Sequence, residues 1–212
     1  MTAKRISGLY AVTPDLADTQ QLLAMVEATL QGGASLLQYR NKSASQPLNH
    51  EQAAAMLALC RHYNVPLIIN DHAGLCCELD ADGVHLGGED GNIAAARALL
   101  GTDKIIGASC YNDLDLAVEA KMQGADYVAF GACFSSGTKP AAARAPLELF
   151  SRAKHTVGLP TVAIGGIDAS NLAQAISAGA DSVALISAIF GGTGDICLRT
   201  ATLARMFHHG RE

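Results

Sequence analysis

Short apolar runs that end abruptly in polar or glycine-rich clusters recur along this chain. They are LLQYRNK at 36–42, LIINDH at 67–72, GVHLGGED at 83–90, IIGASCYN at 105–112, VAIGGID at 162–168 and VALIS at 183–187. Strands of a parallel sheet are buried on both faces and are therefore almost continuously apolar. The polar clusters would then gather at the carboxyl ends of the strands, where such sheets bind ligands. The pattern predicts an enzyme or a ligand-binding protein built on parallel strands.

Strand-like and helix-like segments alternate through the 212 residues. The expected strands are 7–12, 36–40, 65–70, 82–86, 105–109, 126–130, 160–164 and 181–186. The expected helices are 19–31, 47–62, a short one at 73–79, 91–100, 112–123, 146–156, 168–178 and 195–208. This order predicts an α/β fold, a single-domain (β/α)8 TIM barrel over residues 1–212. A doubly wound open sheet is the alternative, but the chain lacks the dinucleotide motif GxGxxG.

Four similar stretches support successive strand–helix units. GGASLLQ, DADGVHLG, GADYVAFG and GADSVALI each place a small or acidic residue after a helix and before a β-rich run. The spacing is too irregular for a solenoid. It suits the repeating unit of a barrel.

Charge and cysteine content restrict the partners and the compartment. The net charge of −5 argues against nucleic acid and against an anionic membrane, whereas a local basic cluster can still hold a small anionic substrate. Six cysteines without CxxC or zinc-ligand spacing indicate reduced thiols and a cytoplasmic protein. The chain shows no secretion signal and no apolar stretch of about 18 residues that would cross a membrane. The sequence leaves a homo-oligomer open.

A basic cluster follows the second expected strand. Gln38, Arg40 and Lys42 occupy alternate positions, which places them on one side of an extended segment. Arg40 offers a bidentate fork and Lys42 a compact charge, so both can converge on one phosphate. A solvated pair of loop charges is the alternative, but the position directly after a buried strand favours anion binding.

Carboxylates follow the third and fourth expected strands. Asn70 and Asp71 come after one strand, and Asp90 comes after the next through a Gly87–Gly88 turn. Neighbouring strands lie about 4.8 Å apart, so the two carboxylates can reach one ion. Oxygen ligands with few protein donors suit Mg²⁺. Each aspartate could instead cap a helix, but the adjacent cations favour a metal–diphosphate site.

The later strand ends carry further candidates. Ser109 ends the fifth strand, and Lys139 lies in the long segment 131–145, whose length favours a functional loop over a merely disordered one. Gly165-Gly166 after the seventh strand and Ile186-Ser187 after the eighth mark the usual phosphate site of such barrels. The alternative for Gly165 and Gly166 is that they only form a turn and bind no phosphate.

The histidines and cysteines indicate no nucleophilic dyad or triad. No Ser-His-Asp or Cys-His arrangement emerges, and no histidine has metal-ligand spacing. His85 could donate to a bound anion or be a hydrogen-bonded core histidine. Both interpretations stay open.

In their order, QYRNK, IINDH, GVHLGGED, GASCYN, the SSGTK loop, AIGGI and LIS resemble the thiamine-phosphate synthase family over residues 8–190 or so. The resemblance implies a (β/α)8 barrel and a transferase. The enzyme that the resemblance implies would join hydroxymethylpyrimidine diphosphate to a thiazole phosphate after Mg²⁺-assisted, dissociative loss of pyrophosphate. The family often has Pro-Thr in the loop where this chain has Ser135-Ser136.

The resemblance also implies roles for individual residues. Asp71 and Asp90 would ligate Mg²⁺. The residues that would bind the pyrimidine diphosphate are Gln38, Tyr39, Arg40, Asn41, Lys42, Asn70, Ser109 and Lys139, with catalytic roles for Arg40, Lys42, Ser109 and Lys139. The residues that would bind the thiazole phosphate are Ser136, Gly137, Thr138, Gly166, Ile186 and Ser187.

Two other functions remain open from the sequence. A related thiazole tautomerase would need no diphosphate site, so Arg40, Lys42, Asp71 and Asp90 argue against it. A phosphate-binding protein without turnover would carry the same anion sites.

Overall fold

The computed structural model describes residues 6–87, 91–135 and 144–210. The strands are β1 Gly8–Val12, β2 Leu36–Tyr39, β3 Leu67–Asn70, β4 Gly83–Leu86, β5 Ile105–Tyr111, β6 Tyr127–Phe130, β7 Thr161–Ile164 and β8 Ser182–Leu185. The helices are α1 Thr19–Gln31, α2 Gln46–Tyr63, α3 Ala73–Leu79, α4 Ile93–Leu100, α5 Leu114–Met122, α6 Glu148–Thr156, α7 Leu172–Ser177, α8 Ser187–Phe190 and α9 Ile196–His209.

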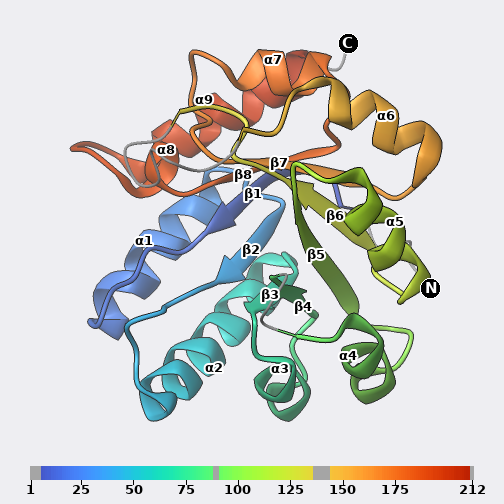
Figure 1. The fold of residues 1–212 in the computed structure, drawn as a ribbon. Helices are drawn as coiled ribbons and strands as arrows, with labels where there is room; N and C mark the ends of the chain where they lie inside the picture. The colour runs from blue at the N-terminus through green and yellow to red at the C-terminus, as the bar shows by residue number, and fades with distance from the viewer. Residues whose placement is uncertain (1–5, 88–90, 136–143, 211–212) are drawn as a thin grey trace.

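The strands close into a barrel in chain order, and the helices surround it (Figure 1). Neighbouring strands are parallel throughout, including β1 and β8, which complete the closure. The chain is therefore a TIM barrel, as the alternation of segments predicts. The open-sheet alternative is excluded because a closed barrel has no edge strands.

Alternation along the strands separates two apolar regions. Tyr10 and Val12 belong to a compact cluster with residues of the other strands, whereas Leu9 and Ala11 belong to a larger cluster that includes the helices. Side chains of a strand alternate between faces, so the compact cluster fills the barrel and the larger one lies between barrel and helices. The barrel interior is thus a packed core.

Three aspartates hold the amino end of the barrel together. The carboxylate of Asp82 accepts a hydrogen bond from the backbone N–H of Leu67 at 2.8 Å. Asp126 accepts from Ile106 at 2.8 Å, and Asp181 accepts from the first residue of β7 at 2.9 Å. Each aspartate precedes an even-numbered strand and binds the strand before it. The repeated acidic residue seen in the sequence therefore joins neighbouring strands.

Helix α7 begins later than the predicted range of 168–178. The side chain of Asp168 accepts from the backbone N–H of Ser170 at 2.8 Å and closes a turn. Asn171 is the residue that precedes the first helical turn. The local Asp–Ser hydrogen bond competes with the helix and delays its start.

Among the described residues, no helix combines the length and apolar character that a membrane span requires. All six cysteines are free thiols.

Candidate active site

The loops after β1 and β2 are joined by hydrogen bonds at the carboxyl end of the barrel. The buried hydroxyl of Thr13 donates to the carbonyl of Arg40 and accepts from its backbone N–H, both at 2.8 Å. One carboxylate oxygen of Asp15 accepts from Arg40 Nη1 at 3.0 Å and from the backbone N–H of Lys42 at 2.9 Å. These bonds hold the backbone of the predicted basic cluster.

Tyr39 and Asn41 point toward α2. The Tyr39 hydroxyl lies 2.8 Å from Asn49 Oδ1 and 2.9 Å from Gln52 Oε1, and its single hydrogen is shared between these two acceptors. Asn41 donates from Nδ2 to the carbonyl of Leu16 at 2.8 Å and to Gln52 Oε1 at 3.1 Å. Gln52 is fully buried. The two residues therefore brace the strand end from the helix side.

Asp71 has an unusual backbone at the end of β3. Its φ of 62° lies in the left-handed region, which aspartate tolerates better than most residues. Its backbone N–H donates to the carbonyl of His85 at 2.8 Å, and Asn70 Nδ2 donates to its carboxylate at 2.5 Å. His72, rather than Asp71, is the residue before the first turn of α3. A capping role therefore does not explain this carboxylate.

The capping position of α4 is taken by Asn92. Its side chain accepts from the backbone N–H of Ala95 at 2.9 Å. The alternative of a helix cap for Asp90 is thereby weakened. Asp90 itself lies outside the described residues, as do Gly88 and Glu89.

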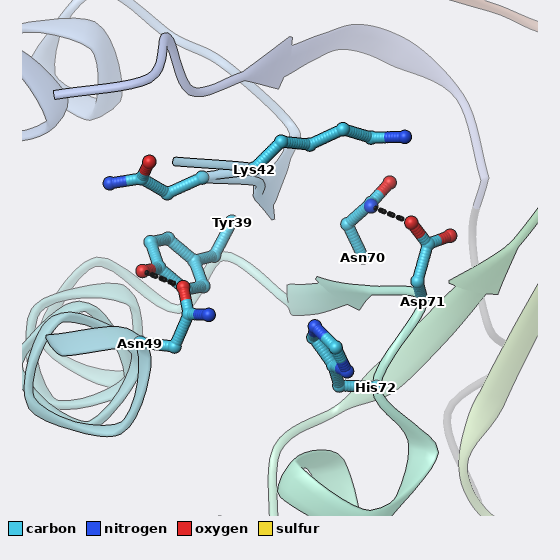
Figure 2. Close-up of a pocket in the computed structure, with 7 residues that line it drawn as sticks. Tyr39, Lys42, Asn49, Asn70, Asp71 and His72 are labelled. Carbon is cyan, nitrogen blue, oxygen red and sulfur yellow. Dashed lines mark hydrogen bonds between the residues drawn. The ribbon is translucent and has the colours of Figure 1, made fainter. Parts of the chain in front are cut away.

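One pocket combines residues from the ends of β2 and β3. Figure 2 shows Lys42 extending over the side of this pocket where Asn70 and Asp71 lie, with Tyr39 and Asn49 on the other side. The pocket is lined by Tyr39, Asn41, Lys42, Asn49, Asn70, Asp71 and His72. The cation, amide and carboxylate predicted from separate strand ends therefore face one cavity.

Gln38 and Ser109 lie nearer the barrel interior. Gln38 Nε2 donates to the Tyr10 hydroxyl at 2.9 Å, and the Ser109 hydroxyl lies 2.9 Å from His85 Nε2. The other ring nitrogen of His85 lies 2.9 Å from the Tyr127 hydroxyl. His85 is therefore a buried histidine with both nitrogens engaged, as the interpretation of a hydrogen-bonded core histidine expects.

Glycines let two strand-end segments approach closely after β6 and β7. Gly165 and Gly166 have φ values of 95° and 66°, which disfavour any side chain. A Cβ on Gly166 would lie 2.5 Å from the carbonyl oxygen of Phe134 and 2.6 Å from that of Ser135. The segment after β6 is further held by a 3.0 Å bond from the Phe134 N–H to the Gly165 carbonyl. The predicted loop residues Ser136, Gly137, Thr138 and Lys139 lie outside the described residues.

Ile186 and Ser187 are exposed at the start of α8, directly after β8. The amides of the first helical turn have no intrahelical acceptor by position. The two residues are thus placed at the carboxyl end of the barrel, next in the sheet to β7 and its glycines.

The side chains near this end offer no activated cysteine. Burial raises the pKa of Cys110 to about 12 and that of Cys133 to about 11, so both thiols are protonated at neutral pH. Within the described part of the chain, no group of three or more His, Cys, Asp or Glu residues could hold a metal ion.

Thr13, Asp15 and Gln52 are residues of this site that sequence reasoning missed. The signal was available for the first two, because the apolar run GLYAV ends in the polar cluster TPD, as the other strand runs do. Gln52 gave no signal, since it is one of several polar residues in a helical segment. Its burial becomes visible only when α2 packs on β2.

The closed barrel, with a basic cluster, a carboxylate and a glycine turn at the carboxyl ends of its strands, defines the class of (β/α)8-barrel enzymes. Residues 9–189 match the family model described as thiamine monophosphate synthase. The chain belongs to this family. Its activity is that of thiamine-phosphate synthase, a transferase of thiamine biosynthesis.

Individual relatives agree with the family. The chain is 59% identical over 203 residues to the thiamine-phosphate synthase of Methylobacillus flagellatus, covering 96% of this chain and 94% of that one. It is 50% identical to that of Nitrosospira multiformis, covering 96% and 87%. The solved thiamine phosphate pyrophosphorylase from Pyrococcus furiosus has a TM-score of 0.85 and 32% identity, covering 97% of this chain and 98% of that one.

Proposed function

We propose that the protein joins hydroxymethylpyrimidine diphosphate to a thiazole phosphate at the carboxyl end of the barrel, releasing pyrophosphate. The observation that carries this proposal is the pocket onto which Lys42, Asn70 and Asp71 converge from neighbouring strand ends. A cation beside an amide and a carboxylate suits a diphosphate and its accompanying metal. A thiazole tautomerase would have no use for this combination.

The diphosphate would be bound by residues after β2, β3 and β5. Asp15 accepts one Nη1 hydrogen bond from Arg40, and a guanidinium has five N–H donors, so others remain for phosphate oxygens. Lys42 would add a charge from the pocket rim. The binding set would be Gln38, Tyr39, Arg40, Asn41, Lys42, Asn70, Ser109 and Lys139.

Asp71 and Asp90 would hold Mg²⁺. The donor chemistry fits, because Mg²⁺ takes one or two carboxylates together with waters and phosphate oxygens. Asp71 supports this role because its carboxylate lines the pocket and does not cap α3. When bound there, the ion would neutralise negative charge on the pyrophosphate oxygens.

A second anion site would lie at β7 and β8. Gly166, held against the segment after β6, and the exposed first turn at Ile186 and Ser187 support it. Backbone N–H groups at such turns bind phosphate without a side-chain charge. Together with Ser136, Gly137 and Thr138, they would hold the thiazole phosphate.

This arrangement can catalyse the transfer without a general base. Breaking the C–O bond leaves the electron pair on pyrophosphate, where Arg40, Lys42, Ser109 and Lys139 would stabilise the added charge. The thiazole nitrogen then attacks the pyrimidinylmethyl cation with its own lone pair and loses no proton. The loss of pyrophosphate precedes the attack in this dissociative order.

We also place the protein in the cytoplasm, with small molecules as its partners. The free thiols support this assignment, since oxidising compartments favour disulfides.

The direct test incubates the protein with both substrates and Mg²⁺, then measures thiamine phosphate by mass and pyrophosphate by a coupled assay. The proposal predicts equal amounts of the two products. Calorimetry that shows tight binding of both substrates without product would instead support a binding protein without turnover.

A further inference from the structure

A continuous hydrogen-bonded chain crosses the barrel interior from β2 to β5. It begins at Gln38, whose Nε2 lies 2.9 Å from the Tyr10 hydroxyl. That hydroxyl lies 2.8 Å from the Tyr127 hydroxyl, which lies 2.9 Å from His85 Nδ1. His85 Nε2 lies 2.9 Å from the Ser109 hydroxyl. The chain therefore connects two residues that we assign to the pyrimidine diphosphate.

The register of the barrel makes this chain geometrically possible. His85, Gly107 and Tyr127 are paired across β4, β5 and β6. Gly107 has no side chain, so the rings of His85 and Tyr127 stack across it with centroids 5.5 Å apart. A Cβ on Gly107 would lie 2.0 Å from Tyr127 Cζ. Glycine at this position thus admits the tyrosine ring into the layer.

The direction of the hydrogen bonds follows from counting donors. An amide nitrogen can only donate, so Tyr10 accepts from Gln38. His85 is buried with a hydroxyl group at each ring nitrogen, an arrangement that suits the neutral ring with one donor nitrogen. If Tyr10 donates to Tyr127 and Tyr127 donates to His85 Nδ1, both tyrosine hydrogens have an acceptor.

With Gln38 Nε2 facing Tyr10, as the structure places it, the other directions each leave a tyrosine hydroxyl hydrogen without an acceptor. If Tyr127 donated to Tyr10, the Tyr10 hydrogen would have none among the described residues. If His85 donated from Nδ1 while Tyr10 still donated to Tyr127, the Tyr127 hydrogen would have none. A buried unpaired donor costs about 1–3 kcal/mol, and both tyrosines are at most 1% exposed. His85 therefore carries its hydrogen on Nε2 and donates to Ser109.

The direction of the chain and the orientation of the Gln38 amide are coupled, and the structure has the combination in which Nε2 faces Tyr10. A flipped amide would turn Oε1 toward Tyr10 and would require the whole chain to reverse, with Tyr127 donating to Tyr10, His85 Nδ1 to Tyr127 and Ser109 to His85 Nε2. Without that reversal, two acceptors would face each other. The amide therefore keeps Oε1 and its second N–H for a ligand, an adjacent acceptor and donor.

We propose that Tyr10, Tyr127 and His85 are positioning residues that hold the Gln38 amide in the one orientation that matches an aminopyrimidine and rejects its oxo analogue. An amino group next to a ring nitrogen presents a donor beside an acceptor, which a glutamine amide can bind with two hydrogen bonds. An oxo group next to a ring N–H presents the reverse pattern and would need the flipped amide. This inference rests on the proposed function, since it takes Gln38 as a contact of the pyrimidine ring.

The first test needs no turnover. Nitrogen-15 NMR of the protein at neutral pH distinguishes the two histidine tautomers, and His85→Gln identifies the signals of His85. We expect an unprotonated Nδ1 and a protonated Nε2. In Tyr127→Phe, which removes the donor to Nδ1, the two signals should move toward each other as the tautomers mix. A protonated Nδ1 in the wild-type protein would overturn the proposal.

The second test compares the binding of the amino and oxo forms of the pyrimidinylmethyl monophosphate, which lack the pyrophosphate leaving group. Calorimetry gives the ratio of their dissociation constants in the wild-type protein and in Tyr10→Phe. Without the Tyr10 hydroxyl the amide can flip, so we expect the preference for the amino form to fall about tenfold, the typical value of one hydrogen bond. Tyr63→Phe is the matched control, because its hydroxyl also contacts two side chains, Glu27 and Gln31, but lies on the surface.

The outcomes separate a positioning role from a structural one. A structural role would weaken the binding of both forms equally and leave their ratio unchanged, and that result would overturn the proposal. A wild-type protein that makes no thiamine phosphate would refute the proposed function instead. The positioning proposal fails, while the proposed function stands, if thiamine phosphate forms normally but the ratio of the two dissociation constants is the same in the wild-type protein, Tyr10→Phe and Tyr63→Phe.

Discussion

The two ends of the barrel use the same side chains for different purposes. At the amino end, Asp82, Asp126 and Asp181 accept hydrogen bonds from the backbone of neighbouring strands. At the carboxyl end, Asp71 lines a pocket and receives a hydrogen bond from the adjacent Asn70. Carboxylates bound to the backbone contribute to stability, whereas a carboxylate that faces a cavity is placed to bind a ligand.

The contrast is sharpest between Asp71 and Asp80. Both have left-handed backbones, with φ values of 62° and 55°. Asp80 ends α3 and pairs with Lys104 Nζ at 2.5 Å and Arg61 Nη2 at 3.4 Å. The two aspartates share residue type and backbone conformation, so their differences arise from which end of the barrel they occupy.

Removal of divalent metal should have the largest effect, and it should affect only the carboxyl end. We expect EDTA to abolish product formation and added Mg²⁺ to restore it, because the carboxylates there would hold the ion. The melting temperature in EDTA should stay the same, since the amino-end hydrogen bonds involve no metal. A large drop in melting temperature would instead indicate a metal that stabilises the fold.

Asp126→Asn should destabilise the amino end of the barrel without changing the catalytic rate. Asp126 pairs with Arg97 Nη2 at 2.6 Å, and both side chains are mostly buried. Loss of this charge pair should lower the free energy of unfolding by about 2 kcal/mol, less than for a fully buried pair. Urea denaturation gives the free energy. The kcat, measured well below the melting temperature, should be that of the wild type, and a marked loss would contradict the division between the ends.

Arg40→Lys should weaken the binding of one substrate. The substitution keeps the charge but removes the fork that binds phosphate oxygens in pairs. We expect the KM for the pyrimidine diphosphate to rise about tenfold, as for the loss of one charge-assisted hydrogen bond, with the thiazole phosphate almost unaffected. Arg61→Lys, an arginine of the amino end that also pairs with an aspartate, is the control. Equal losses for both substrates would mean that the two anion sites are not separate.

The smallest effect concerns the acid stability of the amino end. The hydrogen bond from Lys104 lowers the pKa of Asp80 below its ordinary value of 3.8. The folded state then favours the ionised form, so this contribution is present above pH 3.8 and is lost as the pH falls through the lowered pKa. The difference in melting temperature between the wild type and Asp80→Asn should therefore shrink on acidification. A difference that is constant from pH 7 to pH 3 would contradict the assignment.

The sequence predicts the barrel and much of its carboxyl end, because local patterns determine both. Apolar runs mark the strands, and a polar residue directly after a run, such as Lys42 or Asp71, has to lie at the strand end. Tyr10 and Tyr127 could not be found in this way. They are 117 residues apart, and each lies inside an apolar run that indicates ordinary core. Their contact depends on barrel closure and on the space left by Gly107.

The measurement that tests the account most directly compares Asp71→Asn with Asp80→Asn. Asparagine tolerates the left-handed backbone, so both variants remove a charge without adding strain. The initial rate of pyrophosphate release is measured for each at saturating substrates and Mg²⁺. The account predicts a loss of about a hundredfold or more for Asp71→Asn and an unchanged rate for Asp80→Asn. Equal rates in the two variants would contradict the placement of the chemistry at the carboxyl end.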